Sequence, residues 1–406
     1  MKPIRLGVIF DQQIGTGGGY QQALNAALLV KQLSADLVEP IYFTTLKENT
    51  RTLLEYGINA IHLDLSLYDI AWIYFLRFIQ SGHIIKIIKY LSRQNPFERA
   101  LNKQKIDLVY FLSPSSRAID LEKLNYITTV WDLCHRDDPE FPEVRWERQL
   151  ESREKNFRAL LPRATAIFVD STIGKANVIH RYGIDEDRIH VMPFQGAVTT
   201  RLDSINLQAN EFDVREKYDL KFPYIFYPAQ FWAHKNHVYV LNGLKSLESK
   251  YGLVVGAIFA GGDRGNAEYV EEYAARLGIT ERVRFVGFVS NQEIKSLYKQ
   301  SLALVMPTYF GPTNLPPLEA FGLGVPVLYS DKAGLREQVG DAALLMNLKA
   351  PETMADHLHA LIKDQTLRDR LIMAGKNKLR QIEAIDRIAI LQGVIEDFRW
   401  RRLCWK

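Results

Sequence analysis

The sequence predicts an α/β protein built from two doubly wound domains with parallel sheets. Short runs rich in β-branched and aromatic residues alternate with longer segments of helical periodicity. Strands and helices that alternate in this way form crossover units, and crossover units build a parallel sheet. The chain has 406 residues, of which 47% are hydrophobic, so it can bury a large core and is too long for one compact domain.

Six strand-like runs and the helical segments between them account for the N-terminal half. The first run, residues 5–10, is followed at once by Asp11, which makes it too short for a signal-peptide core or a membrane span. Helical spacing is clear over residues 21–33 and 146–161. The expected strands are RLGVIF, LVEPIYF, DLVYFL, ITTVWDL, AIFVDS and RIHVMPF.

A polar, poorly periodic stretch near residues 195–222 separates the two halves, and the alternation of strands and helices then restarts. We expect an N-terminal domain over residues 1–195, a linker over 196–221 and a C-terminal domain over 222–385. Residues 386–406 are expected to form a helix or tail that packs back on the N-terminal domain or on a membrane. The expected C-terminal strands are YIFYPA, VVGAIFAG, RVRFVGFV, LALVMPT, PVLYSD and AALLMN.

Charge and cysteine content argue against several classes of protein. The formal net charge is +4, and no block of lysines interleaved with aromatic residues resembles a nucleic-acid groove, so nucleic acid is not an expected partner. Cys134 and Cys404 have no metal-ligand spacing, and two thiols so far apart favour a reducing, cytoplasmic compartment. The acidic run at residues 185–187 is expected in a solvated turn, so no metal is implied.

Residues 309–331, YFGPTNLPPLEAFGLGVPVLYSD, join two expected strands through a loop rich in proline and glycine. Two consecutive prolines are tolerated in the first turn of a helix, so a helix is expected to begin near Leu315 and to run to about Gly322. The N-terminus of a helix favours anions. The small residues Gly311 and Thr313 would let a phosphate approach the backbone.

Glu319 lies about one turn into this expected helix. A carboxylate there can accept two hydrogen bonds from a vicinal diol such as a ribose. The alternative is that Glu319 only stabilises the start of the helix electrostatically, by about 0.3–1 kcal/mol. The spacing alone leaves both interpretations open.

Lys235 follows another expected strand, which ends at about Ala229. A lysine at the carboxyl end of a strand, beside the start of a helix, suits a diphosphate leaving group because negative charge builds up on its oxygens as the bond breaks. A solvated surface lysine is the alternative. That alternative does not explain why both candidate residues follow strands of the same half.

The C-terminal half resembles the retaining GT-B-fold glycosyltransferases often called family 4, or group 1. The resemblance runs through most of residues 222–350 and includes PAQFWAHKNH, TNLPPLEAFGLGVPVLYSD and GLREQVGDAALLMN. It is weaker in the N-terminal half, where GTGGGYQQALNAALLVKQL resembles the family's glycine-rich loop and TVWDLCHRDDPEFPEV resembles a segment that carries a family histidine. The resemblance implies a GT-B fold, in which two Rossmann-like domains face each other across a cleft, and a hexosyltransferase activity.

The resemblance also implies roles for individual residues. Lys235 would bind the donor diphosphate and act in catalysis, and Glu319 would hold the ribose. The other implied donor contacts are Gly18 and Gly19 beside the phosphates, Gln230 on a phosphate, Phe288 and Val289 beside the nucleobase, Thr313 near the phosphates, and the backbone amides of Asn314, Leu315 and Pro316 on the diphosphate and sugar hydroxyls.

Three positions depart from the family pattern. Gly311 replaces the first glutamate of a pair, Gln230 replaces an arginine, and Trp131 replaces a histidine. Gln230 can still donate two hydrogen bonds, though without charge assistance. Trp131 is expected to pack as a buried side chain, and His135 or Asp132 would orient the sugar or the acceptor instead.

The front-face retaining transfer that the resemblance implies needs no protein nucleophile, because the leaving diphosphate can take the acceptor proton. No cofactor or metal is expected, and the implied partners are a nucleotide-sugar donor and a glycan acceptor in surface polysaccharide assembly. Two alternatives stay open. One is a nucleotide-sugar epimerase or hydrolase of the same fold, which would need a further acid near the anomeric centre, and the other is a catalytically silent nucleotide-sugar-binding subunit.

Two segments combine apolar and basic residues. Residues 66–94 are densely apolar but are interrupted by arginine and lysine, so they do not form a transmembrane helix and suit one or two helices with a basic edge. Residues 399–406, RWRRLCWK, place tryptophan between basic residues as interfacial anchors do. Both segments would suit docking on the inner face of the plasma membrane and a lipid-linked glycan acceptor. The alternative is that both pack on the protein itself.

Overall fold

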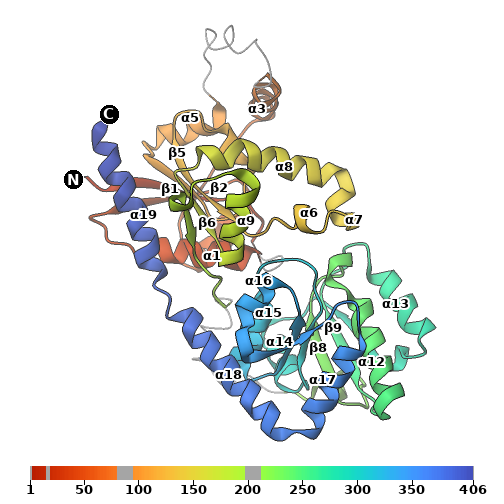
Figure 1. The fold of residues 1–406 in the computed structure, drawn as a ribbon. Helices are drawn as coiled ribbons and strands as arrows, with labels where there is room; N and C mark the ends of the chain where they lie inside the picture. Colours follow the sequence, from red (N-terminus) through yellow and green to blue (C-terminus); the bar gives the residue numbers. More distant parts are fainter. Residues whose placement is uncertain (1, 15–18, 80–94, 197–211, 406) are drawn as a thin grey trace. The chain divides into compact units, whose positions relative to one another are not determined.

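The computed structural model places the chain in two compact units, and each is described by itself (Figure 1). The described residues are 2–14, 19–79, 95–196 and 212–405. The first unit contains residues 1–131, 151–192 and 386–406, and the second contains 132–150 and 193–385. This division differs from the expected one, because residues 132–150 and 193–195 belong to the second unit, which also takes in the expected linker.

The first unit is built on a seven-stranded parallel sheet in the order β3-β2-β1-β4-β5-β6-β7. The order reverses between β1 and β4, which makes the carboxyl edge there a topological switch point. Only the three-residue β3 was not predicted, because so short a run carries no periodicity. The strands are β1 Ile4–Phe10, β2 Val38–Thr44, β3 Ala60–His62, β4 Leu108–Phe111, β5 Asn125–Val130, β6 Ala166–Val169 and β7 Ile189–Val191.

Helices cover this first sheet. They include α1 Gly19–Val30, α2 Asn49–Glu55, α3 Leu67–Ile79, α5 Pro96–Lys103, α8 Gln149–Leu160, α9 Thr172–Tyr182 and the C-terminal α19 Arg387–Arg401. The α19 helix packs against α1 and buries Leu391, Ile395 and Phe398. All four residues of β4 are buried, as expected for a parallel strand covered on both faces.

The second unit is built on a six-stranded parallel sheet in the order β10-β9-β8-β11-β12-β13. Its order reverses between β8 and β11, so the loops that follow these two strands meet at a switch point. The two parallel sheets confirm the predicted class of two doubly wound domains. The strands are β8 Tyr224–Pro228, β9 Gly256–Ala260, β10 Val283–Gly287, β11 Leu304–Met306, β12 Val327–Ser330 and β13 Ala343–Met346.

Helices lie on both faces of the second sheet, with α12, α13 and α17 on one side and α14, α15 and α18 on the other (Figure 1). The unit also contains the short helices α6 and α7, which lie within residues 132–150. Its helices are α6 Cys134–Asp137, α7 Pro142–Arg145, α11 Val214–Lys217, α12 His237–Tyr251, α13 Ala267–Arg276, α14 Asn291–Lys299, α15 Leu315–Leu323, α16 Ala333–Val339, α17 Glu352–Lys363 and α18 Gln365–Glu383.

No helix among the described residues is long and apolar enough to cross a bilayer. The apolar segment predicted over residues 66–94 is described only as far as Ile79, where α3 ends. The rest of that segment lies outside the described residues.

Candidate active site

The candidate donor site lies at the switch point of the second sheet. Lys235 belongs to the loop that follows β8, and residues 307–314 form the loop that follows β11. In doubly wound sheets, ligands bind outside the carboxyl ends of the strands at this kind of reversal. The two motifs singled out in the sequence therefore come from strands that are neighbours in the sheet.

Lys235 is half-buried at this switch point. Its Nζ donates a hydrogen bond to Asn314 Oδ1 at 3.3 Å, and its backbone oxygen accepts one from the Tyr227 hydroxyl at 2.8 Å. Burial lowers the pKa of the Lys235 ammonium to about 8, although the negative charges of Cys134, Asp132 and Glu143 act in the opposite direction. The alternative of a solvated surface lysine is therefore wrong.

The helix after β11 begins at Leu315, as predicted. The expected backbone amides are fewer than the resemblance implied, because a proline has no N–H and Pro316 cannot donate. The N–H of Asn314 already donates to Gln338 Oε1 at 3.0 Å. Of these three residues, the described structure leaves only the Leu315 N–H for a ligand, so an anion here depends more on Lys235 than on the helix start.

The side chain of Asn314 is held from a second direction. Its Nδ2 donates to the Tyr329 hydroxyl at 2.7 Å, and that hydroxyl donates to Gln338 Oε1 at 3.0 Å. Gln338 Nε2 in turn donates to the Asn314 backbone oxygen. This network orients Asn314 Oδ1 toward the Lys235 ammonium.

Glu319 lies in the second turn of α15, and no acidic residue occupies the first turn. Stabilisation of the helix start, the alternative interpretation, is therefore not its role. The Tyr298 hydroxyl donates to Glu319 Oε2 at 3.0 Å, while Oε1 has no hydrogen bond within the described part of the chain. Burial raises the pKa of the Glu319 carboxyl, and the hydrogen bond from Tyr298 opposes that rise. The carboxylate keeps an oxygen with which it can accept hydrogen bonds from a ligand.

Two further predicted donor residues follow β10. Phe288 is 83% exposed, whereas its neighbour Val289 is 7% exposed and belongs to the core. An aromatic ring that exposed at the carboxyl edge of a parallel sheet offers a face on which a nucleobase could stack. Gln230 lies after β8, and its Oε1 accepts a hydrogen bond from Trp232 Nε1 at 3.1 Å, which leaves its amide hydrogens for a phosphate.

The backbone conformation at position 311 favours glycine. Its φ angle is +95°, and a Cβ atom there would lie 2.8 Å from the backbone oxygen of Thr313. The Gly311 N–H donates to Cys134 Sγ at 3.1 Å. A glutamate at this position, as the family pattern implies, would require a different loop conformation.

The first unit holds the predicted glycine loop. Gly18 lies outside the described residues, and Gly19 is the first residue of α1. A Cβ atom on Gly19 would lie 2.6 Å from Cζ3 of Trp131, so the indole packs directly on this glycine. Trp131 is half-buried, not buried as expected, because its ring lies against Gly19, which has no side chain to cover it.

The segment of residues 132–150 ties the two donor loops together, which the sequence did not predict. Glu143 accepts hydrogen bonds from the backbone N–H of His234, at 3.0 Å, and from its ring nitrogen. The His234 ring stacks on Phe310 with centroids 4.0 Å apart, and Phe141 packs on Phe310 and Tyr309. Sequence reasoning missed Glu143 and His234 because they are 91 positions apart.

The ionisation of this pair follows from its surroundings. Burial lowers the pKa of His234 to about 4, and Glu143 only partly offsets this, so the imidazole is neutral at pH 7. Burial opposes ionisation of Glu143, but its hydrogen bonds from His234 outweigh burial and keep its pKa below the usual value. The neutral His234 imidazole and the His234 backbone N–H both donate to Glu143, and these bonds hold the backbone next to Lys235 in place.

The two residues expected to replace the missing histidine lie in the same segment. Asp132 Oδ1 accepts a hydrogen bond from the Cys134 N–H at 3.1 Å, and Asp132 acts on Lys235 electrostatically. His135 is only 1% exposed. The roles of Asp132 and His135 in orienting sugar or acceptor stay predictions. Within the described ranges, no group of three or more histidine, cysteine, aspartate or glutamate side chains could hold a metal.

Solved structures with the same arrangement define the class of fold. A glycosyltransferase from Rickettsia africae has a TM-score of 0.68 at 16% identity, and covers 97% of this chain and 98% of its own. Anabaena HepE in complex with UDP has a TM-score of 0.65 at 15% identity, and covers 98% of this chain and 100% of its own. The protein has the GT-B fold.

Sequence comparisons relate part of the chain to known glycosyltransferases. The family model of glycosyl transferases group 1 matches residues 209–378. O-antigen chain mannosyltransferase B of Escherichia coli is 26% identical over 59% of this chain and 62% of its own length. D-inositol 3-phosphate glycosyltransferase of Nocardia farcinica is 27% identical over 61% of this chain and 55% of its own length. The family match covers less than half of the chain, and the curated relatives are matched over less than two thirds of their own length.

Proposed function

We propose that this protein is a retaining glycosyltransferase that moves a sugar from a nucleotide-diphosphate sugar to a glycan acceptor in surface polysaccharide assembly. The observation that carries the proposal is the half-buried Lys235, held by Asn314 at the switch point of the second sheet. Two similarities support it: one relative is named an O-antigen chain mannosyltransferase, and one solved neighbour holds UDP.

In the proposed reaction, the bond between the anomeric carbon and the diphosphate oxygen breaks while the acceptor oxygen bonds to that carbon on the same face. The leaving diphosphate takes the acceptor proton, so no protein nucleophile, cofactor or metal is invoked. The Lys235 ammonium stabilises the charge that develops on the diphosphate. Glu319 accepts hydrogen bonds from the ribose, Phe288 stacks on the base and Gln230 donates to a phosphate.

A lipid-linked glycan is the proposed acceptor, and the inner face of the plasma membrane is the proposed place of action. The α3 helix exposes Leu67, Tyr74 and Phe75, which are 87%, 65% and 45% accessible. At the C-terminus, Trp400 and Trp405 are 64% and 47% exposed beside basic residues. Exposed aromatic residues beside positive charge suit the interface of an anionic bilayer.

A catalytically silent nucleotide-sugar-binding subunit is the second candidate. The replacements at Gly311, Gln230 and Trp131, which each remove a charge or a proton carrier, favour it. Retention of a positioned Lys235 and of a ligand-accessible Glu319 oxygen argues for activity instead. The epimerase or hydrolase alternative receives no support from the described site, because Gly311 occupies the place of the additional acid.

A thermal-shift panel of nucleoside diphosphates and nucleotide sugars tests the donor site first. A ligand at 100 times its dissociation constant stabilises the folded protein by about 2.7 kcal/mol, which raises the melting temperature measurably. Stabilisation by one base would identify the nucleotide. If every nucleotide leaves the melting temperature unchanged, the donor site is refuted.

Replacement of Lys235 tests the catalytic role. The substitution Lys235→Ala is expected to lower kcat for sugar transfer by about 100-fold to 1,000-fold, because it removes the charge that stabilises the leaving group. Lys221→Ala is the matched control, since Lys221 is exposed at the opposite end of β8. Equal transfer rates in the two variants would remove Lys235 from the mechanism.

Replacement of Glu319 tests ribose binding. Glu319→Ala is expected to weaken the binding of the stabilising nucleotide by about tenfold or more, because hydrogen bonds to a charged group are lost. Calorimetric titration of wild type and variant measures the difference. Tyr298→Phe, which keeps the carboxylate and removes only its internal donor, should bind the nucleotide within a few-fold of wild type.

A further inference from the structure

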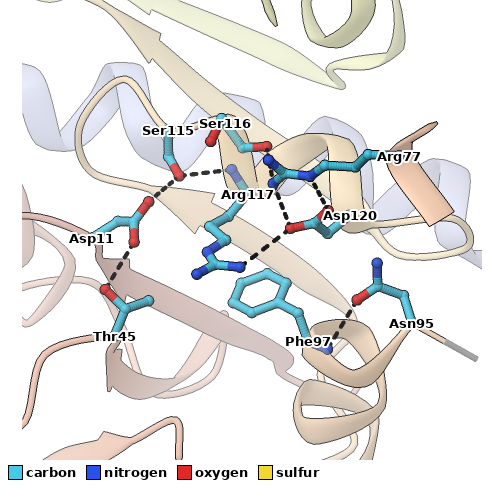
Figure 2. Close-up of polar contacts among 9 residues, drawn as sticks. All are labelled: Asp11, Thr45, Arg77, Asn95, Phe97, Ser115, Ser116, Arg117 and Asp120. Atoms are coloured by element: carbon cyan, nitrogen blue, oxygen red, sulfur yellow. Dashed lines mark hydrogen bonds and ion pairs between the residues drawn. The ribbon is translucent and has the colours of Figure 1, made fainter. Parts of the chain in front are cut away.

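The first unit has its own polar site at its own switch point (Figure 2). Asp11 follows β1, Thr45 follows β2, and Ser115 and Arg117 follow β4. The strand order reverses between β1 and β4, which is where doubly wound sheets bind ligands. No residue of this site has a role in the donor chemistry described above.

A buried carboxylate anchors the site. The Asp120 side chain is fully buried and accepts hydrogen bonds from Arg77 Nε and Nη2, each at 2.7 Å. Arg77 Nη2 also donates to the Ser116 backbone oxygen at 3.1 Å. Burial alone would lower the pKa of Arg77, but the bonds to Asp120 outweigh it and raise the pKa above its usual value. Arg77 and Asp120 therefore form a bidentate ion pair that largely satisfies both groups.

Arg117 has no comparable partner. Its Nη1 lies 3.7 Å from Asp120 Oδ2, which is too long for a hydrogen bond, and its guanidinium lies 5.9 Å from the Phe97 ring centroid. The side chain is only 25% exposed. Within the described part of the chain, the guanidinium donates no hydrogen bond, although it carries five N–H donors. A guanidinium that is three-quarters buried and donates no hydrogen bond within the protein can donate its N–H groups to a ligand.

Asp11 forms hydrogen bonds with two hydroxyl groups of the site and no ion pair with Arg117. Its two oxygens accept hydrogen bonds from the Thr45 hydroxyl at 2.8 Å and the Ser115 hydroxyl at 2.5 Å. The Ser115 hydroxyl also accepts the Arg117 backbone N–H at 3.1 Å. Among the residues in Figure 2, Asp11 makes no ion pair with either guanidinium. The direct ion pairs therefore join two guanidinium groups to one carboxylate, and Asp11 acts on Arg77 only at longer range.

The apolar face of α3 lies next to the Arg77 guanidinium. Arg77 lies in the last turn of α3, and its guanidinium is 5.9 Å from the Tyr74 ring centroid. The exposed residues Leu67, Tyr74 and Phe75 share one helical face, because they are spaced by seven and eight positions. The site thus combines a guanidinium that lacks hydrogen bonds with an exposed apolar surface on the same unit.

We propose that this site binds the phosphate of a lipid-phosphate acceptor. The planar guanidinium of Arg117 donates two parallel hydrogen bonds to the phosphate, and the exposed face of α3 contacts the lipid chain. Arg77 is a positioning residue, because its pairing with Asp120 keeps that carboxylate from closing a bidentate pair with Arg117. The inference rests on the proposed glycosyltransferase function and names phosphate as the group that links the proposed glycan acceptor to its lipid.

Calorimetric titration of the full chain with farnesyl phosphate, farnesol and methyl phosphate tests this site. Farnesyl phosphate is expected to bind at least tenfold more tightly than either of the other two, because only it supplies both the charge and the chain. Arg117→Gln is expected to weaken farnesyl phosphate binding by about tenfold or more. The control is Arg5→Gln at the amino end of β1, which should bind farnesyl phosphate as wild type does.

The titrations separate the possible failures. Absence of farnesyl phosphate binding, or equal binding in Arg117→Gln, overturns the inference. Equal binding of methyl phosphate and farnesyl phosphate, both lost in Arg117→Gln, supports the phosphate site and overturns the lipid assignment. An unchanged melting temperature of each variant reports that the first unit is folded, and nucleotide titration of the same samples reports on the donor site of the second unit. If nucleotides bind but farnesyl phosphate does not, the phosphate site is refuted and the proposed function stands. If farnesyl phosphate binds but no nucleotide does, the proposed function is refuted and the phosphate site stands.

Discussion

At the residue scale, the central feature is Lys235, whose pKa is lowered by burial. Lys235 follows a buried strand, and among the described residues its ammonium donates one hydrogen bond, to Asn314 Oδ1. Burial penalises its charged form and lowers its pKa to about 8. A diphosphate bound nearby would supply the missing negative charge, so donor binding and protonation of Lys235 are linked.

This linkage predicts a pH dependence for nucleotide binding. As the pH rises above about 8, Lys235 of the unbound protein loses its proton. Because the diphosphate binds the protonated ammonium, Lys235 must then take up a proton on binding. The affinity for the stabilising nucleoside diphosphate is expected to fall by up to about tenfold per pH unit above pH 8. Calorimetric titrations between pH 7.5 and about pH 9.5 measure this slope.

Lys235→Arg is the control for that slope, because a guanidinium does not titrate in this range. A wild-type affinity that is independent of pH would contradict the lowered pKa. The free protein should show the opposite trend in stability. Between pH 8 and 10.5, the pKa of a lysine exposed to water, the unfolded state binds more protons at this position than the folded state does. The contribution of Lys235 to the free energy of unfolding therefore rises with pH in this range.

At the scale of elements, two loops at the switch point are held in place by a segment distant in sequence. Lys332 Nζ donates to Asp138 Oδ2 at 2.7 Å and to the Tyr309 backbone oxygen at 2.8 Å. Together with the Glu143 contacts to His234, these bonds connect residues 132–150 to the loops after β8 and β11. The loop after β11 then passes through the positive φ angle of Gly311.

The conformation of this loop predicts the effect of a small substitution. Gly311→Ala is expected to lower the free energy of unfolding by about 1–3 kcal/mol, because alanine is strained at positive φ and its Cβ would approach Thr313. Gly262→Ala is the control, since Gly262 has open space around it and no positive φ angle. Urea unfolding of both variants measures the difference, and equal stabilities would disprove the backbone explanation for Gly311.

At the scale of the whole molecule, sequence order and spatial units do not coincide. The chain leaves the first unit after β5, contributes residues 132–150 to the second unit and returns at α8. It returns a second time as α19, which packs on α1 with its buried Leu391 and Ile395. The first unit is therefore incomplete without residues 386–406.

The position of α19 predicts where a core substitution acts. Ile395→Ala is expected to destabilise the first unit by about 2–5 kcal/mol, because Ile395 is fully buried and its replacement leaves a cavity. Nucleotide binding by the second unit should persist, which calorimetric titration checks. The control Gln392→Ala changes an exposed position of the same helix and should alter stability by no more than about 0.5 kcal/mol. A similar loss in both variants would contradict the packing of α19.

Much of the fold could be predicted because its signals are local. The strands beside Lys235 and before residues 309–314 are short apolar runs, and the prolines at 316 and 317 mark the start of α15. The three-residue β3 was missed because its identity depends on pairing with β2. The backbone donors expected at the helix start were overestimated, because the Gln338 side chain takes the N–H of Asn314.

The sequence by itself determined the α/β class, the two parallel sheets and the places of Lys235 and Glu319, because strand periodicity and helix-start chemistry are properties of short stretches. Tertiary structure alone decided that Lys235 is half-buried and that His234 is neutral beside Glu143. It also decided that Arg117 lies beside a carboxylate already held by Arg77. Burial and pairing are set by residues far apart in the chain, and they in turn set charge and hydrogen bonding.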